Sequence, residues 1–155
     1  MQVPNDCQRG LAICLALCYD EEKHKGKIRH LYLRIGEKTG EVMVCFVINA
    51  DKLPLEKTLV SLLCKKFECI KTICVNVNKK SDNVIMGDKT HAVYGDGFIT
   101  DILCDTKFQI SPNSFYQVNR DTAEILYGIA KEYAAPENKT VLDLYCGAGT
   151  IGLSM

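Results

Sequence analysis

Apolar residues recur in the first half of the chain in patterns that alternate between strand and helix. Residues 28–36 (IRHLYLRIG) are rich in β-branched and aromatic side chains, which favours a strand. Residues 41–49 (EVMVCFVIN) are apolar at successive positions, as in a strand buried on both faces. Because the turn EKTG separates them, the two stretches predict a β-hairpin near the middle of a sheet.

A helix and a third strand are predicted next. Residues 53–67 predict a helix with Pro54 in its first turn, where the missing N–H costs nothing, and residues 69–78 alternate as a strand does. The apolar positions at helical spacing are Leu55, Leu59, Leu62 and Leu63. Residues 91–103 are extended but interrupted by two glycines, and a short strand follows at 107–111.

The last part of the chain predicts helix, strand and glycine loop. Ser111 and Pro112 mark the start of a helical region. Within residues 121–134 the apolar side chains Ile125, Ile129 and Tyr133 recur every four positions. Asp121 and Glu124 have the spacing of a capping pair for this helix. Residues 141–145 form an apolar stretch that predicts a strand.

These elements predict an α+β module with an antiparallel sheet, followed by the beginning of a second unit of α/β, Rossmann-like type. We place the α+β domain at 27–110 and the second unit at 111–155, where only the first helix, strand and loop are present. Residues 1–26 form an N-terminal segment with an uncertain boundary, in which residues 10–18 (GLAICLALC) predict a short helix.

Composition narrows the class of protein. The chain has 155 residues, 47% of them hydrophobic, and a formal net charge of zero, so any contact with nucleic acid must come from a local patch. We find no secretory signal and no apolar run long enough to cross a membrane. Nine cysteines, mostly inside apolar runs, favour buried, reduced thiols and a cytoplasmic location.

A glycine loop follows the strand predicted at 141–145. Gly147 permits a tight turn, and Gly149 lets a ligand approach the backbone because no Cβ stands in the way. Asp143 precedes the loop, where a carboxylate holds either the loop or a ligand amine. The spacing Gly147, Gly149, Gly152 also fits a dinucleotide site, so an NAD enzyme stays open, as does an ordinary strand-to-helix turn.

Two segments in this order resemble a known family. The sequence FQISPNSFYQVN followed by VLDLYCGAGTIGL is similar to the 5-methyluridine RNA methyltransferases, and KGKIRHLYLRIGEKTGEVMVCFV resembles their central domain. The resemblance covers residues 20–155. It implies S-adenosyl-L-methionine as cofactor and methylation of uridine at C5, in ribosomal RNA in preference to transfer RNA. The alternative is a non-catalytic α+β module that binds RNA or protein.

The resemblance assigns the cofactor contacts. The Gln of FYQVN, the aromatic residue of DLYCG and the polar residue after the glycine loop correspond to Gln117, Tyr145 and Thr150. Thr150 departs from the Asn that the family commonly has there, which weakens its assignment. Gly147 and Gly149 complete the set, because they open the loop toward the ligand.

The resemblance also implies that the catalytic residues lie outside this sequence. The family's reaction uses a Cys nucleophile that adds to C6 of uracil and a base that removes the C5 proton, and we expect both to lie beyond Met155. Cys146 lies in the cofactor loop and is better explained as a structural thiol. The chain is therefore expected to be an inactive piece of a longer enzyme. Cys7 is a weak candidate for an iron–sulfur ligand, a cluster that only the full-length protein could hold.

Two surfaces are expected to make contacts. Lys27, Arg29, His30 and Arg34 lie on or next to the first predicted strand, where alternation places the first two on one face and the last two on the other. They are our candidates for RNA contact. The strand at 141–145 would expose an unpaired edge, so we expect self-association through it.

Overall fold

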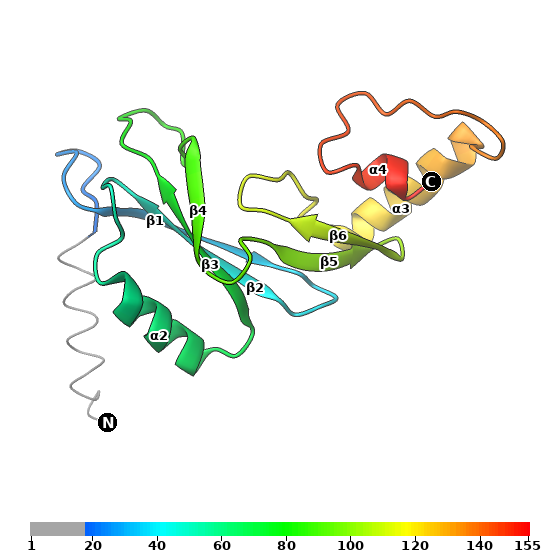
Figure 1. Ribbon diagram of the computed structural model, residues 1–155. Coiled ribbons are helices and arrows are strands. Elements are labelled where there is room, and N and C mark those ends of the chain that lie inside the picture. Colours follow the sequence, from blue (N-terminus) through cyan, green and yellow to red (C-terminus); the bar gives the residue numbers. More distant parts are fainter. Residues whose placement is uncertain (1–17) are drawn as a thin grey trace.

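The computed structural model describes residues 18–155 as two small sheets with helices beside them (Figure 1). A four-stranded sheet with one helix forms one part, and a two-stranded sheet with two helices forms the other. The elements are β1 (Ile28–Ile35), β2 (Val42–Ile48), α2 (Glu56–Lys66), β3 (Ile70–Val77), β4 (Lys89–Tyr94), β5 (Ile99–Leu103), β6 (Thr106–Ile110), α3 (Arg120–Ala134) and α4 (Thr150–Leu153). No helix of residues 18–155 is long and apolar enough to cross a bilayer.

The larger sheet is mixed, which corrects the antiparallel sheet expected from the sequence. Its strand order is β1-β2-β3-β4; β1–β2 and β3–β4 are antiparallel, whereas β2–β3 is parallel. The reason lies in the connection, because α2 carries the chain back across the sheet before β3 begins, as a crossover between parallel strands requires. The predicted hairpin and the predicted central position of β2 are confirmed.

The core of this part lies between the sheet and α2. Val44, Phe46 and Ile48 on β2 pack with Ile73 and Val75 on β3, and each of these side chains is at most 8% exposed. Burying five such side chains contributes roughly 1.5–3 kcal/mol each before the cost of ordering the chain. This cluster therefore fixes which strands pair and in which register.

Helix α2 differs in detail from its prediction. Leu59 and Leu63 pack against the core, but Leu55 and Leu62 are 51% and 58% exposed. Leu55 is the residue before the helix and has a left-handed φ of 53°, so Pro54 lies outside the helix. The apolar stripe predicted for α2 is thus wider than the part of the helix surface that the sheet covers.

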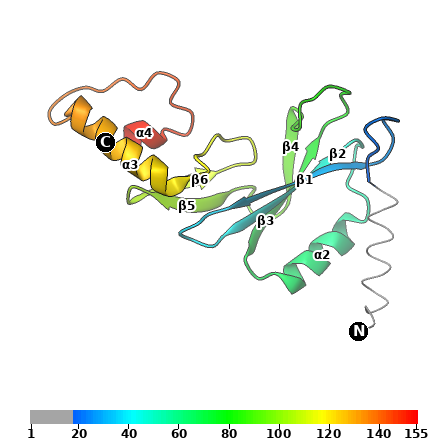
Figure 2. The same ribbon diagram turned by 180° about the vertical axis from the view of Figure 1, so that it is seen from behind.

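The two sheets meet where the β1–β2 turn contacts β5. The Met43 side chain is fully buried against Ile99 and Ile110 of the smaller sheet. The Thr100 N–H donates to a carboxylate oxygen of Glu41 at 2.7 Å, and the Lys38 N–H donates to Asp101 Oδ1 at 2.9 Å. The end of the first hairpin lies beside β5 (Figure 2), and these bonds join the two.

Helix α3 covers one side of the β5–β6 hairpin. Ala123 and Tyr127, one turn apart, are buried against Leu103 and Phe108. The β5–β6 hairpin therefore contacts both α3 and the first hairpin, so the domain division at residue 110 stays a prediction.

The start of α3 corrects two expectations. The helix begins at Arg120 with Asn119 as its cap, whose side chain accepts from the Thr122 N–H at 3.1 Å. Glu124 does not complete a capping pair with Asp121; it accepts from the Cys104 N–H at 3.1 Å. Residues 112–113 form only a turn, because the Ser114 hydroxyl bonds the Ser111 N–H at 3.2 Å.

The apolar face that the sequence predicts for α3 is not the face that is buried. Ile125, Ile129 and Tyr133 are 67%, 44% and 87% exposed. The β5–β6 hairpin is only two strands wide, and it covers the side of the helix that carries Ala123 and Tyr127 instead.

Residues 141–145 do not form the predicted strand. They lie in an irregular segment, with Leu142 79% and Leu144 71% exposed. A strand is held by hydrogen bonds to a neighbouring strand, and none pairs with this segment among residues 18–155. The segment therefore exposes an apolar loop in place of a strand edge, and self-association through residues 141–145 stays a prediction.

Candidate functional site

The glycine loop runs from Cys146 to α4. Gly147 and Gly149 both have left-handed φ values, 56° and 74°, which glycine adopts at no steric cost. The Gly149 N–H donates to the Cys146 carbonyl at 2.8 Å, and this bond closes the turn. Apart from Gly147 itself and its two chain neighbours, no atom of the described residues lies within 4 Å of the position that a Cβ on Gly147 would take. The loop thus offers bare backbone beside open space, which suits a ligand that contacts main-chain groups.

Two hydrogen bonds hold this loop in place. Asp143 accepts from the Gly152 N–H at 3.1 Å, so its carboxylate holds the loop, one of the two roles expected for it. The Thr150 hydroxyl bonds the Tyr127 hydroxyl at 2.9 Å, and both residues are buried. Tyr127 was missed in the sequence, although its spacing of four from Ala123 was a signal for a second apolar face of α3.

The structure brings four of the five predicted cofactor residues together. Tyr145 directly precedes the glycine loop, which contains Gly147 and Gly149, and Thr150 directly follows it as the first residue of α4. The Tyr145 side chain is completely exposed. Gln117 lies elsewhere. It lines a hollow of about 260 Å³ between β1 and residues 116–120, and no residue of the glycine loop lines that hollow.

The Gln117 hollow contains a polar pair that the sequence did not reveal. Asp101 is 1% exposed, and it accepts from the Tyr116 hydroxyl at 3.2 Å and from the Lys38 N–H. Burial and the neighbouring Asp101 charge raise the pKa of the Tyr116 hydroxyl well above its ordinary value. This phenol therefore stays protonated and donates to the carboxylate, which satisfies a buried charge.

Most of the chain is similar to parts of known RNA methyltransferases. An uncharacterised RNA methyltransferase of Halalkalibacterium halodurans is 47% identical over 136 residues, which cover 87% of this chain and 30% of that protein. One of Caldanaerobacter subterraneus is 42% identical over 141 residues, or 90% of this chain and 31% of that protein. The chain is a homologue of part of these RNA methyltransferases. No protein-family model matches it.

A solved structure resembles this chain in fold. It is the Pyrococcus abyssi tRNA (uracil-54, C5)-methyltransferase in complex with S-adenosyl-L-homocysteine, with a TM-score of 0.70 and 32% sequence identity. The match covers 86% of this chain and 31% of that one. The chain thus spans a little under a third of the length of the relatives it matches.

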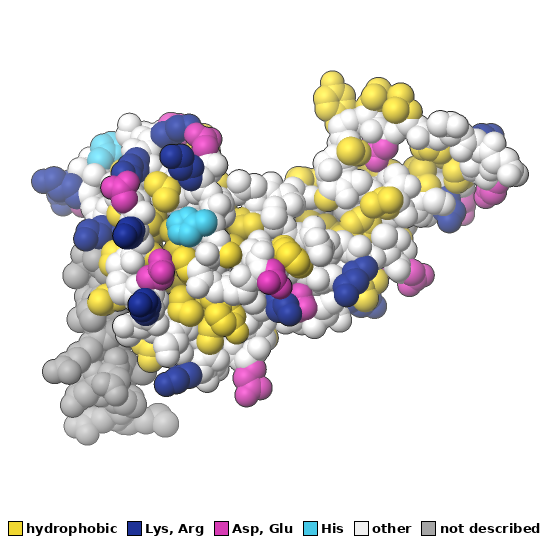
Figure 3. Space-filling view, in the orientation of Figure 1, with side chains coloured by type: hydrophobic (Ala, Val, Ile, Leu, Met, Phe, Trp, Pro, Cys, Tyr) yellow, Lys and Arg dark blue, Asp and Glu magenta, His cyan; other side chains and the backbone are white. Residues whose placement is uncertain are grey.

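Basic residues of this chain surround β1. On the face seen in Figure 3, most Lys, Arg and His side chains lie over the part with the four-stranded sheet, and acidic side chains lie among them. Lys27 is exposed, and His30 lies 3.9 Å from Glu21. Arg34 donates to the Ser111 carbonyl at 2.6 Å and lies over the Tyr32 ring, 5.6 Å from its centroid.

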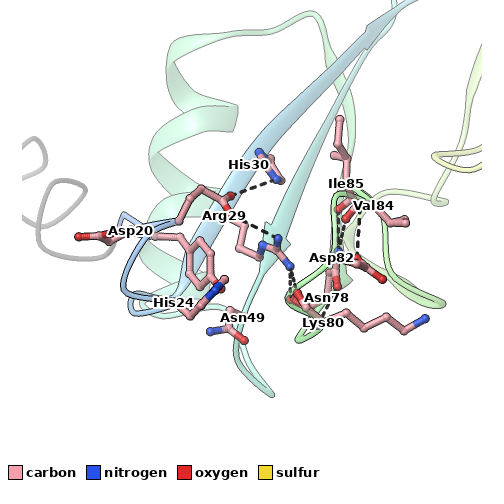
Figure 4. A network of polar contacts seen from close by, with 12 residues as sticks. Asp20, His24, Arg29, His30, Asn49, Asn78, Lys80, Asp82, Val84 and Ile85 are labelled. Atoms are coloured by element: carbon pink, nitrogen blue, oxygen red, sulfur yellow. Dashed lines mark hydrogen bonds and ion pairs between the residues drawn. The ribbon is translucent and has the colours of Figure 1, made fainter.

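Arg29 departs from the alternation expected along the strand. The register of β1 against β2 shifts between Ile28 and His30, so Arg29 is the extra residue of a bulge. Its side chain is 2% exposed. Nη1 donates to the Lys80 carbonyl and, at 3.5 Å, to the Asn78 carbonyl (Figure 4). Arg29 is therefore a bridge between β1 and the loop after β3, and its guanidinium is turned inward.

Metal ligands are not assembled in the described part of the chain. Residues 18–155 hold no group of three His, Cys, Asp or Glu side chains that could bind a metal ion. Cys7, and the stretch 10–18 except for Cys18, lie outside the described residues. The iron–sulfur assignment of Cys7 stays a prediction.

Proposed function

We propose that these residues belong to an S-adenosyl-L-methionine-dependent enzyme that methylates C5 of uridine in RNA. The match to a tRNA (uracil-54, C5)-methyltransferase over 86% of the chain, at 32% identity, carries this proposal. The alternative, a non-catalytic module for RNA or protein, does not need an anchored glycine loop with open backbone. Because the chain spans 30% of its relatives, we assign the complete reaction to the longer protein.

The cofactor is proposed to bind along the glycine loop. Gly147 and Gly149 would present main-chain groups, and Tyr145 would supply an aromatic wall. The Thr150 hydroxyl is bonded to the Tyr127 hydroxyl. We therefore assign Thr150 to holding the loop, in preference to direct contact with the cofactor. Gln117 would contact the methionyl end of the cofactor if the ligand extends from the glycine loop to the segment around Gln117.

The RNA is proposed to contact the face around β1. Lys27, His30 and Arg34 remain the candidates for this contact, and Arg29 leaves the set because it is buried. We place the nucleophilic Cys and the base of the covalent mechanism outside these 155 residues, in the longer protein. The solved relative acts on tRNA, whereas the sequence resemblance favours ribosomal RNA, and product analysis decides between them.

A segment exchange tests this function. The segment of the Pyrococcus abyssi enzyme that matches this chain is replaced by the corresponding residues of this chain, and RNA products are digested and analysed by mass spectrometry. We expect 5-methyluridine at a reduced rate. The matched control carries Gly147→Val, which fills the open side of the loop at a left-handed position and should abolish cofactor binding. A folded exchange protein that binds S-adenosyl-L-homocysteine but forms no 5-methyluridine would contradict the proposal.

A further inference from the structure

Two hollows share one pair of lining side chains, Tyr32 and Arg34 on β1. The Gln117 hollow, of about 260 Å³, is lined by both, together with Tyr116. A second hollow of about 390 Å³, the Phe115 hollow, is also lined by both and reaches Phe115. One aromatic–guanidinium pair thus borders two neighbouring concave surfaces.

The pair is held in a fixed arrangement. Tyr32 and Arg34 are two residues apart on a strand, so they share a face. The Arg34 guanidinium lies over the Tyr32 ring and is tied to the Ser111 carbonyl through Nη1, its one hydrogen bond to the described residues. The remaining guanidinium N–H groups stay available to a ligand, and little side-chain entropy is lost when they bind one.

The size and lining of the hollows select the ligand. A volume of about 260 Å³ is smaller than the roughly 300–1,000 Å³ typical of sites for drug-sized molecules, so a single flat ring system fits it better. Tyrosine rings and a stacked guanidinium are the surfaces on which unpaired bases bind. Glu37 and the buried Asp101 also line the Gln117 hollow and repel an anion there. Arg120, a further lining residue, is paired with Glu124, so a phosphate is favoured at Arg34, which lines both hollows.

We propose that two consecutive nucleotides of single-stranded RNA bind across this pair, one base in each hollow and the connecting phosphate at Arg34. The inference rests on the proposed function, because it takes RNA as the substrate. It adds a site for nucleotides outside the glycine loop, formed by β1 and residues 111–117.

Fluorescence anisotropy with a labelled uridine octamer and the 155-residue chain tests the site. We expect Tyr32→Ala to weaken binding on the order of ten-fold, whereas Tyr32→Phe keeps the ring and the affinity. Arg34→Met should lower the slope of log affinity against log salt by about 0.7, the loss of one phosphate contact. The matched controls are Tyr94→Ala and Lys57→Met, which remove an exposed ring from β4 and a charge from α2.

The outcomes separate the two proposals. Unlabelled UpU should displace the octamer better than uridine monophosphate does, because it fills both hollows. If the octamer binds but Tyr32→Ala and Arg34→Met behave as their controls do, the site is overturned while the proposed function stands. If the folded chain binds no RNA, the site is overturned as well, and a protein ligand becomes the better explanation for these hollows. Thermal melts show that each variant is folded.

Discussion

Arg29→Met removes a charged group that the structure places inside the protein. The wild-type guanidinium bonds the carbonyls of Asn78 and Lys80, lies 4.8 Å from the centroid of the Tyr19 ring and lies 3.7 Å from Glu21. Methionine is of similar length and fills the space without those bonds. We therefore expect a loss of stability and no specific loss of RNA affinity.

The magnitude follows from these contacts. A hydrogen bond from a charged donor contributes about 1.5–3 kcal/mol, and the ring contact about 0.5–1 kcal/mol. The Glu21 side chain is 58% exposed, so its ion pair adds about 0–1 kcal/mol. Against this, Arg29 Nε is buried with no hydrogen-bond partner among residues 18–155, a cost that methionine removes. The net loss is about 2 kcal/mol, or about 4–8 °C in Tm for a chain of this length.

Urea unfolding followed by circular dichroism measures the change, with Lys27→Met as the matched control. Lys27 is an exposed cation two residues earlier, so its loss should alter the unfolding free energy by less than about 0.5 kcal/mol. An Arg29 variant as stable as that control, with weakened RNA binding, would show that the guanidinium works at the surface and that the bridge is unimportant.

Three further expectations concern the loop, the thiols and the reaction. Thr150→Val leaves the buried Tyr127 hydroxyl unpaired and should cost about 1–3 kcal/mol. Adding Tyr127→Phe should recover part of that loss in a double-mutant cycle, and additive effects would refute the bond. Burial, with a smaller effect of a neighbouring thiol, raises the pKa of the Cys45 thiol from an ordinary 9.0 to about 12. The thiolate then forms more readily in the unfolded chain, so the stability that Cys45 contributes is complete below pH 9 and is lost as the pH rises toward 12. Denaturant titrations across that range check this, and iodoacetamide at pH 8 should modify exposed Cys69 while sparing Cys45. Finally, the 155-residue chain alone should transfer no methyl group from labelled S-adenosyl-L-methionine to uridine-containing RNA, and radioactive RNA would contradict this.

The strands of the larger sheet could be predicted because their patterns are local. The apolar run of β2 and the alternation of β3 each encode a strand, and the turn at 37–40 encodes the hairpin. The direction of β3 is not local, since it depends on how α2 crosses the sheet. The helix was in the prediction, and its consequence, a parallel pair, could have been drawn from the strand–helix–strand order.

Residues at the margins of the fold were harder to predict. The sequence shows that Ile125, Ile129 and Tyr133 share a face of α3, but not that the β5–β6 hairpin covers another side. The bulge at Arg29 is likewise invisible in the sequence, because one extra residue in a ladder leaves no compositional trace. The glycine loop was predicted from its own residues. The hydrogen bond that joins it to α3 could not be, because Tyr127 and Thr150 lie 23 residues apart in the sequence.

The parallel pairing of β2 with β3 also sets an order in which the sheet can assemble. The β1–β2 hairpin joins neighbours across a short turn and forms quickly, but β3 reaches β2 only after the segment that contains α2 has closed. Changes in the turn at 37–40 should therefore slow refolding, and changes in β4 should chiefly speed unfolding. Until β3 arrives, β2 presents an open apolar edge, so the brief interval between hairpin and sheet is when this chain is most exposed to aggregation.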